Sequence, residues 1–367
     1  MKKTYLFIFG TRPEVIKLAP LILKFIEKEE KVVICNTGQH RDLVDDVLTL
    51  FNIKIDFDLQ IMKENQNLFS LTSNLISEFK NVLDISKPDY VFVHGDTTTC
   101  FASSLATFYS KLKLVHVEAG LRTNNKYSPF PEEMNRQLVS KMADIHLCPT
   151  HEAKQNLLKE GIDNNKIFIT GNTVVDALLV AKDKIKKQDK IDIKKLINKE
   201  KFILFTGHRR ENFGEGFKNI FEALLEIAKK NSDVQIIFPI HPNPNVKKEA
   251  LRLLGKTPNI SLTDPVKYGD FIWLMENCEL IITDSGGIQE EAPSFNKIVV
   301  VTRESTERIE SLANGNSIIV GSDKQKLIKT VNALLNKVIK ENISLKSNNP
   351  FGTGQACEHI YSILNAQ

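Results

Sequence analysis

Short runs of hydrophobic residues, separated by longer amphipathic stretches, recur along almost the whole chain. In the first half, such runs predict strands at 4–9, 31–36, 90–93, 114–117, 145–149 and 166–169. In the second half, they predict strands at 202–205, 234–238, 260–262, 280–283, 298–301 and 317–319. Strands that alternate with helical segments of this length indicate parallel sheets with right-handed crossovers. The pattern therefore predicts an α/β protein.

A polar, lysine-rich segment at 182–201 separates the two sets of strands. Twelve strands are more than one twisted open sheet usually holds, so we predict two Rossmann-like domains of six strands each with a cleft between them. We interpret the segment itself as a solvated helix and linker. Helical spacing resumes near the C-terminus, and we expect this last helix to cross back onto the first domain. The predicted domains are 1–172, completed by 355–367, and 173–354.

The composition narrows the class of protein. The net charge is +4, from 49 basic and 45 acidic residues, which is too balanced to indicate nucleic-acid binding. No apolar run approaches the ~20 residues that a membrane span needs, and the apolar run at the N-terminus, about five residues, is shorter than that of a signal peptide. Five scattered cysteines without a CxxC pair indicate neither a disulfide framework nor a zinc site. We expect a cytoplasmic enzyme without a metal.

Charged and polar residues follow nearly every predicted strand, where open α/β sheets bind their ligands. In the first half these are Arg12, Glu14, Lys17, Gln39, His40, Arg41, His94, Asp96, Glu118, Arg122, Glu132 and Glu133, with Arg136 four residues after Glu132. In the second half they are His208, Arg209, His241 and the stretch from Ser285 to Glu291. Each residue alone has an ordinary explanation, such as a helix cap or an i,i+4 ion pair. Their concentration at strand ends indicates a functional site.

The sequence DSGGIQEE is the most informative of these stretches. It follows an apolar strand and opens a helix, and the glycines at 286 and 287 let a ligand approach the backbone. Free N–H groups at a helix start form an anion site suited to a diphosphate, and Glu291, one turn further, could accept hydrogen bonds from ribose hydroxyls. A plain tight turn is the structural alternative for this motif by itself. No G-x-G-x-x-G opens either half, which disfavours a nicotinamide cofactor.

Nine motifs together resemble the non-hydrolysing UDP-N-acetylglucosamine 2-epimerases of bacterial polysaccharide synthesis. They are FGTRPEVIKLAPL, NTGQHRD, VHGDTTT, HVEAGLRT, YSPFPEEMNR, FITGNTVVDAL, TGHRREN, TDSGGIQEEAPS and NPFGTGQA, in this order along nearly the whole chain. The resemblance implies the GT-B architecture, with UDP in the interdomain cleft, and usually a homodimer. It also implies that the enzyme interconverts UDP-GlcNAc and UDP-ManNAc without a metal or redox cofactor.

The resemblance also implies roles for individual residues. The acid/base candidates are Asp96, Glu118 and Glu132, and further catalytic candidates are Lys17 and His208, which contacts the leaving phosphate. The implied substrate contacts are Arg12, Arg136, Phe271, Ser285, Gly286, Gly287, Glu291 and Arg308. Within this set, the resemblance implies Ser285 to Gly287 for the diphosphate, Glu291 for the ribose and Phe271 for the uracil. Members of the family are also activated by their own substrate, and the resemblance implies that Gln39, His40, Arg209 and His241 take part in this regulation.

The chemistry of this reaction fits these residue types. The hydrogen at C2 of the sugar is not acidic, so it leaves only if the C1–O bond breaks with it. Anti elimination then needs a base, an acid that reaches the other face, and cations for the diphosphate. Arg12 and Lys17 are the cations expected at the first strand end.

Four alternatives remain open from the sequence: a GT-B glycosyltransferase, a hydrolysing epimerase, an epimerase acting on a diacetamido uronic acid nucleotide, and a non-catalytic sugar-nucleotide sensor. The first would need an acceptor site and would not need three carboxylates. The elements TGQHR and GHRREN favour the non-hydrolysing type over the second, and GTRPE favours plain GlcNAc over the third. A sensor would not need the acids and bases.

Overall fold

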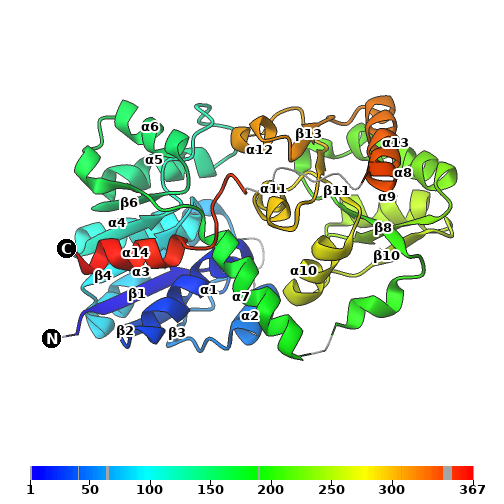
Figure 1. The fold of residues 1–367 in the computed structure, drawn as a ribbon. Coiled ribbons are helices and arrows are strands. Elements are labelled where there is room, and N and C mark those ends of the chain that lie inside the picture. The colour runs from blue at the N-terminus through cyan, green and yellow to red at the C-terminus, as the bar shows by residue number, and fades with distance from the viewer. Residues whose placement is uncertain are drawn as a thin grey trace. The chain divides into compact units, whose positions relative to one another are not determined.

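The computed structural model describes residues 2–39, 41–62, 66–188, 191–306, 308–341 and 349–366. Packing divides the chain into two compact units. The first consists of Met1–Ala181 and Phe351–Gln367, and the second of Lys182–Pro350. Each unit is an α/β domain built around one sheet (Figure 1).

The first unit contains a parallel sheet in the order β3-β2-β1-β4-β5-β6-β7. Its strands are β1 (Thr4–Phe9), β2 (Lys31–Asn36), β3 (Phe57–Asp58), β4 (Tyr90–His94), β5 (Lys113–Val117), β6 (Ile145–Cys148) and β7 (Ile167–Ile169). Every residue of β1 is buried, as expected for a parallel strand covered by helices on both faces. The order reverses between β1 and β4, which places the topological switch point there.

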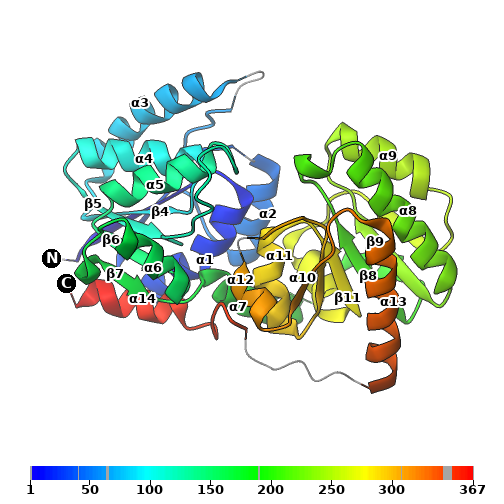
Figure 2. The same cartoon turned by 90° about the horizontal axis from the view of Figure 1, so that it is seen from above.

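Helices cover both faces of this sheet. They are α1 (Arg12–Glu27), α2 (Arg41–Phe51), α3 (Leu68–Ser86), α4 (Thr98–Tyr109), α5 (Glu132–Met142), α6 (His151–Lys159), η1 (Asn164–Lys166), the start of α7 (Thr173–Gln188) and α14 (Ala356–Asn365). One layer packs α3 against α4 and α4 against α5, and another packs α2 and α14 against α1 (Figure 2). The C-terminal helix thus belongs to the N-terminal unit, where the ring of Tyr361 meets that of Phe25 edge-on at 5.2 Å.

The second unit repeats the plan with a parallel sheet in the order β10-β9-β8-β11-β12-β13. Its strands are β8 (Lys201–Thr206), β9 (Val234–Pro239), β10 (Ile260–Thr263), β11 (Leu280–Thr283), β12 (Val299–Val301) and β13 (Ser317–Ile319). Its helices are η2 (Asp192–Leu196), η3 (Arg210–Asn212), α8 (Glu215–Lys230), α9 (Pro244–Leu254), α10 (Tyr268–Asn277), α11 (Gly286–Glu291), η4 (Ala292–Phe295), α12 (Ile309–Ala313) and α13 (Lys324–Glu341). The switch point lies between β8 and β11.

The prediction of two Rossmann-like parallel-sheet domains is confirmed. A GT-B protein consists of two such domains. The count of six strands in each half is wrong for the first sheet, which has a seventh, β3. This strand has only two residues, Phe57–Asp58, so it leaves no apolar run to recognise. In the predicted linker, α7 continues to Gln188 and η2 precedes β8. The division of roles between domains 1–172 and 173–354, and the cleft between them, stay predictions.

None of the described helices is long and apolar enough to cross a membrane.

Candidate functional site

The turn between β1 and α1 is held by a buried carboxylate. Glu14 Oε2 accepts hydrogen bonds from the backbone N–H groups of Gly10 (2.9 Å) and Thr11 (2.8 Å), and its Oε1 accepts one from Thr97 Oγ1 (2.6 Å). Burial raises the pKa of Glu14, and these hydrogen bonds oppose that shift. At Gly10 a Cβ would lie 2.0 Å from Thr37 Oγ1. This turn therefore needs one glycine for close packing, and its amides bind a carboxylate of the protein itself.

The buried Lys17, on α1, forms an ion pair with Glu118 at the end of β5. Asn172 Nδ2 donates to Glu118 Oε2 at 2.9 Å, and His94 Nε2 lies 3.7 Å from the same oxygen. The Glu118 side chain is only 9% exposed, and its backbone adopts a positive φ of 61°. A non-glycine residue in this conformation costs about 1–3 kcal/mol and is found most often at functional sites. Burial lowers the pKa of His94 to about 4, so this imidazole is neutral near pH 7.

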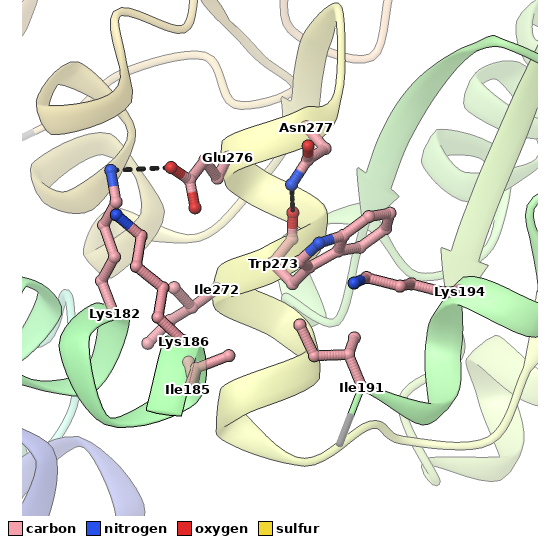
Figure 3. A pocket seen from close by; sticks show the side chains of 9 residues that line it. All are labelled: Lys182, Ile185, Lys186, Ile191, Lys194, Ile272, Trp273, Glu276 and Asn277. Atoms are coloured by element: carbon pink, nitrogen blue, oxygen red, sulfur yellow. Dashed lines mark hydrogen bonds and ion pairs between the residues drawn. The ribbon is translucent and has the colours of Figure 1, made fainter. Parts of the chain in front are cut away.

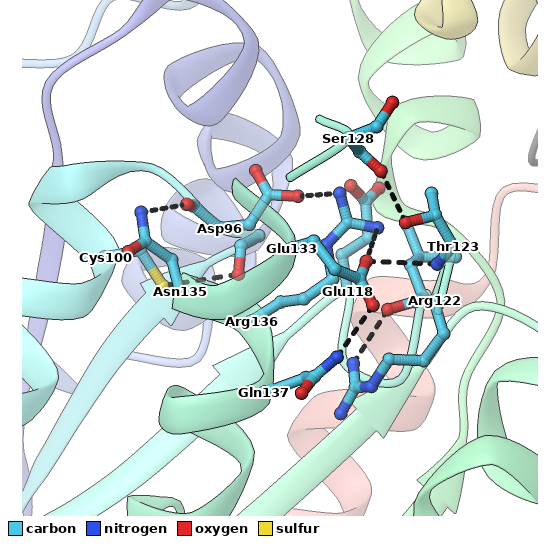
Figure 4. Close-up of polar contacts among 12 residues, drawn as sticks. Asp96, Cys100, Glu118, Arg122, Thr123, Ser128, Glu133, Asn135, Arg136 and Gln137 are labelled. Carbon is cyan, nitrogen blue, oxygen red and sulfur yellow. Dashed lines mark hydrogen bonds and ion pairs between the residues drawn. The ribbon is translucent and has the colours of Figure 1, made fainter. Parts of the chain in front are cut away.

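A second carboxylate lies at the end of the neighbouring strand β4. Arg136 NH2 lies 2.8 Å from Asp96 Oδ2, and its NH1 lies 3.5 Å from Glu133 Oε2 (Figure 4). Glu133 is fully buried and accepts hydrogen bonds from the backbone N–H groups of Thr123 (3.0 Å) and Asn124 (3.2 Å). Glu133 thus fixes both the loop after β5 and the guanidinium that contacts Asp96.

The remaining predicted residues of the first unit lie around these two carboxylates. Arg12 is the first residue of α1 and is half-buried, and Glu132 is the first residue of α5 and is also half-buried. Gln39, which follows β2, accepts a hydrogen bond from Thr99 Oγ1 at 3.1 Å. His40 lies outside the described residues.

In the second unit, the buried Asp284 organises the ends of β8 and β11. Its Oδ2 accepts hydrogen bonds from the backbone N–H groups of His208 (3.0 Å) and Arg209 (2.9 Å), and its Oδ1 lies 3.3 Å from His208 Nδ1. The His208 ring stacks on His241, with 5.4 Å between centroids. Burial lowers the pKa of both histidines, while the charge of Asp284 acts in the opposite direction. Both imidazoles therefore favour the neutral form.

The glycine turn after β11 packs against a guanidinium. A Cβ at Gly286 would lie 2.8 Å from Arg308 Cζ, so only glycine leaves room for this side chain. Arg308 is held by Glu290, whose Oε1 lies 3.0 Å from its Nε and 2.8 Å from its NH2. Gly287, in contrast, has open space around its Cβ position, with Ser285 Oγ at 4.0 Å. Backbone amides and a cation thus meet at one turn.

The turn is followed by an acidic residue on the buried face of α11. Glu291 Oε1 accepts a hydrogen bond from Tyr268 Oη at 3.2 Å. Phe271 is half-buried on α10, one turn beyond Tyr268. In the second unit, Ser285, Gly286, Gly287 and Glu291 therefore lie on the turn after β11 and the short helix α11, and Arg308 packs against that turn. No group of three or more potential metal-binding acids, histidines or cysteines occurs among the described residues.

Comparison with known proteins decides the family. A model of the UDP-N-acetylglucosamine 2-epimerase family matches residues 24–365. The chain belongs to this family. It is 49% identical over 375 residues to a UDP-N-acetylglucosamine 2-epimerase of Campylobacter jejuni, covering 99% of this chain and 98% of the relative. The corresponding protein of Escherichia coli K12 is 47% identical over 368 residues, covering 98% and 97%.

Solved structures of the family have the same fold. A crystal structure of the Neisseria meningitidis UDP-GlcNAc 2-epimerase bound to UDP-GlcNAc superposes with a TM-score of 0.93 at 46% identity. The match covers 99% of this chain and 100% of that one.

Three residues that contact the predicted family residues were missed in the sequence: Asn172, Asp284 and Glu290. Asp284 adjoins Ser285 and Glu290 adjoins Glu291, so proximity to a candidate residue was the available signal. Asn172 lies in the family motif FITGNTVVDAL, but its contact with Glu118 spans 54 residues of sequence and has no local signature.

A separate cavity of about 330 Å³ lies between the end of α7, η2 and α10 (Figure 3). Trp273 forms part of its lining and stacks on Phe202 near the amino end of β8. Lys194 lies over the Trp273 ring at 5.5 Å, and Lys182 pairs with Glu276 at 2.7 Å. Open α/β sheets bind their ligands at the carboxyl ends of the strands. This cavity lies near the amino end of β8, so it is not part of the site described above.

Proposed function

We propose that this chain is a non-hydrolysing UDP-N-acetylglucosamine 2-epimerase that interconverts UDP-GlcNAc and UDP-ManNAc. The proposal is supported by membership of the UDP-N-acetylglucosamine 2-epimerase family and by the similarity to its bacterial members. The observation that carries it is a pair of carboxylates at the adjacent strand ends of β4 and β5, each with its own cation: Asp96 with Arg136 and Glu118 with Lys17. A transferase or a binding protein has no need for two such acid/base groups.

The proposed reaction begins with an anti elimination. A base removes the proton from C2, the C2–H electrons form the C1=C2 double bond, and the C1–O bond breaks with its electrons leaving on UDP. The products are 2-acetamidoglucal and UDP. In the second step, UDP adds back to C1 from the same face while an acid delivers a proton to the opposite face of C2. The sum is an inversion at C2 with no net gain or loss of atoms.

Two faces of one carbon require two proton-transfer groups, because a single fixed base cannot reach both. We assign the acid/base roles to Asp96, Glu118 and Glu132. Lys17 stabilises the ionised form of Glu118, and Arg136 orients Asp96 through its guanidinium. Glu132, at the start of α5, is the third proton-transfer group in this proposal.

The leaving diphosphate is assigned to the second unit. Ser285, Gly286 and Gly287 supply backbone amides, and Arg308 supplies a positive charge against the same turn. Arg12 and His208 complete the phosphate contacts, Glu291 contacts the ribose and Phe271 the uracil. In this proposal no metal or redox cofactor takes part. Gln39, His40, Arg209 and His241 are proposed to bind a second, activating substrate molecule.

We further propose that the enzyme is a cytoplasmic homodimer that supplies ManNAc units for bacterial surface polysaccharide. The dimer is supported by large hydrophobic side chains left exposed on two helices that pack together. These are Phe69 and Ile85 on α3, and Phe108 and Tyr109 on α4, which are 58–88% exposed in the single chain. The rings of Phe108 and Tyr109 lie 6.3 Å apart, and adjacent exposed hydrophobic side chains are typical of an interaction surface.

The proposal is tested by proton NMR of the enzyme with UDP-GlcNAc in deuterated water, without an acceptor. We expect deuterium at C2 of intact UDP-ManNAc. Release of free ManNAc and UDP would instead identify a hydrolysing enzyme. No exchange at C2 would contradict the proposal and favour a glycosyltransferase or a sugar-nucleotide sensor.

Amide substitutions test the acid/base assignment. Asp96→Asn, Glu118→Gln and Glu132→Gln should each lower kcat by about 10²–10⁴-fold, the usual contribution of a general acid or base. Binding of UDP, measured by isothermal titration calorimetry, should stay within about threefold of wild type, since a factor of three is under 1 kcal/mol. If all three variants keep near-normal turnover, the assignment is wrong.

A further inference from the structure

One side chain connects the candidate carboxylate Glu118 to the segments through which the chain passes between its two units. Asn172 lies between β7 and α7 and is buried. Its Nδ2 donates to Glu118 Oε2 at 2.9 Å, and its Oδ1 accepts a hydrogen bond from the backbone N–H of Val174 at 3.0 Å. Its own backbone N–H donates to the carbonyl of Phe351 at 2.8 Å. Its backbone carbonyl accepts a hydrogen bond from the backbone N–H of Val175 at 3.2 Å, so all four hydrogen-bonding groups of this residue are used.

The chemistry of the side chain fits an ionised partner. An amide nitrogen can only donate, so Asn172 Nδ2 stabilises the carboxylate form of Glu118. The orientation of this amide group is fixed by two other hydrogen bonds. The one from Val174 to Oδ1 holds the plane of the amide, and the one from the backbone N–H to Phe351 holds the main chain. Lys17 contacts the same carboxylate from α1, and His94 lies near it from β4. Asn172 and His94 are both neutral near pH 7, and of these two Asn172 lies within hydrogen-bond distance of the acid, at 2.9 Å against 3.7 Å.

Its place in the chain gives this contact a second consequence. The chain leaves the first unit within α7, which begins at the residue after Asn172. It re-enters the first unit at Phe351, whose carbonyl is bound by Asn172. At the adjacent Gly171, with a φ of 85°, a Cβ would lie 3.4 Å from the Phe351 carbonyl oxygen, so the two segments are in close contact. Asn172, which contacts Glu118, is therefore hydrogen-bonded both to the start of α7 and to the segment at Phe351.

We propose that Asn172 is a positioning residue for Glu118, and that it ties the orientation of this carboxylate to the two segments that connect the units. The inference rests on the proposed function, because it assigns Glu118 a proton-transfer role. Asn172 itself does not touch the reacting atoms. It acts by holding Glu118 ionised and in one orientation, so its loss changes proton transfer more than substrate binding.

The decisive variant is Asn172→Asp, which is nearly isosteric. It keeps the Oδ1 acceptor for Val174 and the backbone contact with Phe351, and it replaces only the donor with a second carboxylate oxygen facing Glu118. Two carboxylates at this distance share a proton, which raises the apparent pKa of the pair. We expect the limb of the kcat profile that reports Glu118 to move to higher pH by about one unit or more. We expect kcat at pH 7 to fall at least about tenfold, with KM for UDP-GlcNAc within threefold of wild type.

A matched control is Asn156→Asp. The Asn156 amide donates to the carbonyl of Gly120 at 3.0 Å, two residues beyond Glu118 in the same loop. This variant removes a partly buried donor from the same region without placing a charge in contact with Glu118. It should lower thermal stability without moving the pH profile of kcat, so it separates a structural effect from a positioning effect.

A double variant tests the contact without relying on activity. Asn172→Asp combined with Glu118→Gln reverses donor and acceptor, so the hydrogen bond can form again. We expect the melting temperature of the double variant to lie above that of Asn172→Asp alone. Failure to recover stability, together with an unshifted pH profile in Asn172→Asp, would overturn the inference.

The wild-type experiment in deuterated water keeps this inference distinct from the proposed function. If wild-type enzyme does not exchange deuterium at C2, the proposed function fails. If it does exchange, and the pH profile of Asn172→Asp superposes on that of wild type, the positioning role fails and the function stands.

Discussion

At the scale of single residues, burial decides which side chains carry charge. Three histidines of the first unit, His94, His116 and His146, lie at or within strands, and burial lowers their pKa values to about 4, about 3 and about 4. The His116 ring nitrogen Nε2 lies 2.8 Å from the carbonyl of Gly95, a structural contact. His116 and His146 lie inside their strands and are fully buried, which is typical of structural histidines. Positive charge near Glu118 therefore comes from Lys17.

These histidines predict a loss of stability in mild acid. Their folded pKa values lie below the unfolded value near 6.5, so below pH 6.5 the unfolded chain binds more protons than the folded one. The contribution of these neutral histidines to the free energy of unfolding is therefore complete above about pH 6.5, and it is lost as the pH falls towards 4. We expect His116→Gln to flatten this loss by up to about 1.4 kcal/mol per pH unit. Melting temperatures from pH 7.5 to 4.5 measure it.

The exposed His151 provides the control for this experiment. His151→Gln removes a titratable imidazole at the start of α6 without removing a buried one. The melting temperature of this variant should change with pH by the same amount as that of wild type. Equal slopes for wild type and His116→Gln would contradict the prediction.

A second prediction at this scale concerns Gly286. In Gly286→Ala the new Cβ would displace the Arg308 guanidinium, the far end of a flexible side chain, so the fold should tolerate the change. If Arg308 contacts the diphosphate, affinity for UDP should fall about tenfold or more, which is a loss of about 1.4 kcal/mol. Isothermal titration calorimetry measures it.

Gly216→Ala, in α8, is the matched control for Gly286→Ala. A Cβ there would make ordinary contacts at 3.5 Å or more, so UDP affinity should be unchanged. Unchanged affinity in Gly286→Ala as well would exclude Arg308 from the nucleotide site.

At the scale of elements, helices of the first unit begin where side chains, either local or distant in sequence, satisfy their free N–H groups. Thr97 caps α4 by accepting from the N–H of Cys100 at 3.0 Å. Asp176, on α7, does the same for α14 from 180 residues away, accepting from Ala356 (3.3 Å) and Cys357 (2.9 Å). The C-terminal helix is therefore attached to the first unit by one carboxylate as well as by its apolar face.

This contact predicts the effect of replacing Asp176. Asp176→Ala leaves two buried N–H groups without a partner, at a cost of about 1–3 kcal/mol. Hydrogen exchange of the amides in α14 should become about 10–100-fold faster. Asp176→Asn keeps one acceptor oxygen and should have a smaller effect. Asp183 is an exposed carboxylate on the same helix, so Asp183→Ala should leave the hydrogen-exchange rates in α14 unchanged. Wild-type exchange rates in Asp176→Ala as well would contradict the prediction.

At the scale of the whole molecule, two similar sheets each present a switch point with a different set of side chains. The first carries carboxylates paired with cations, and the second carries a glycine turn with an arginine. This division matches a reaction that needs proton transfer at a sugar carbon and stabilisation of a leaving diphosphate. Each half thus contributes one of the two requirements of the proposed elimination.

The exposed side chains of α3 and α4 predict a dimer that one charge disrupts. Phe108 is 58% exposed near the end of α4. Phe108→Glu should halve the mass measured by light scattering after size exclusion, because a buried, unpaired carboxylate in an interface is strongly unfavourable. Leu251→Glu, at a similarly exposed position on α9, should leave the mass unchanged. A monomeric wild type would contradict the proposed dimer.

The sequence by itself determined the number of domains, the α/β class and twelve of the thirteen strands. This was possible because strands buried on both faces are continuous apolar runs, which are local features. The two-residue β3 is the exception, since its pairing with β2 depends on tertiary contacts. The family motifs also marked most of the strand-end residues.

Only the tertiary structure decided which of those residues meet. Lys17 and Glu118 are 101 residues apart, and they meet because β4 lies between β1 and β5 in the sheet. Asn172 and Glu118 are 54 residues apart, and they meet because β6 lies between β5 and β7. Local spacing reports which side of an element is buried, and it carries no information on which strand ends become neighbours. The partners of each charge, and with them its protonation state, therefore follow from the order of strands in the sheet.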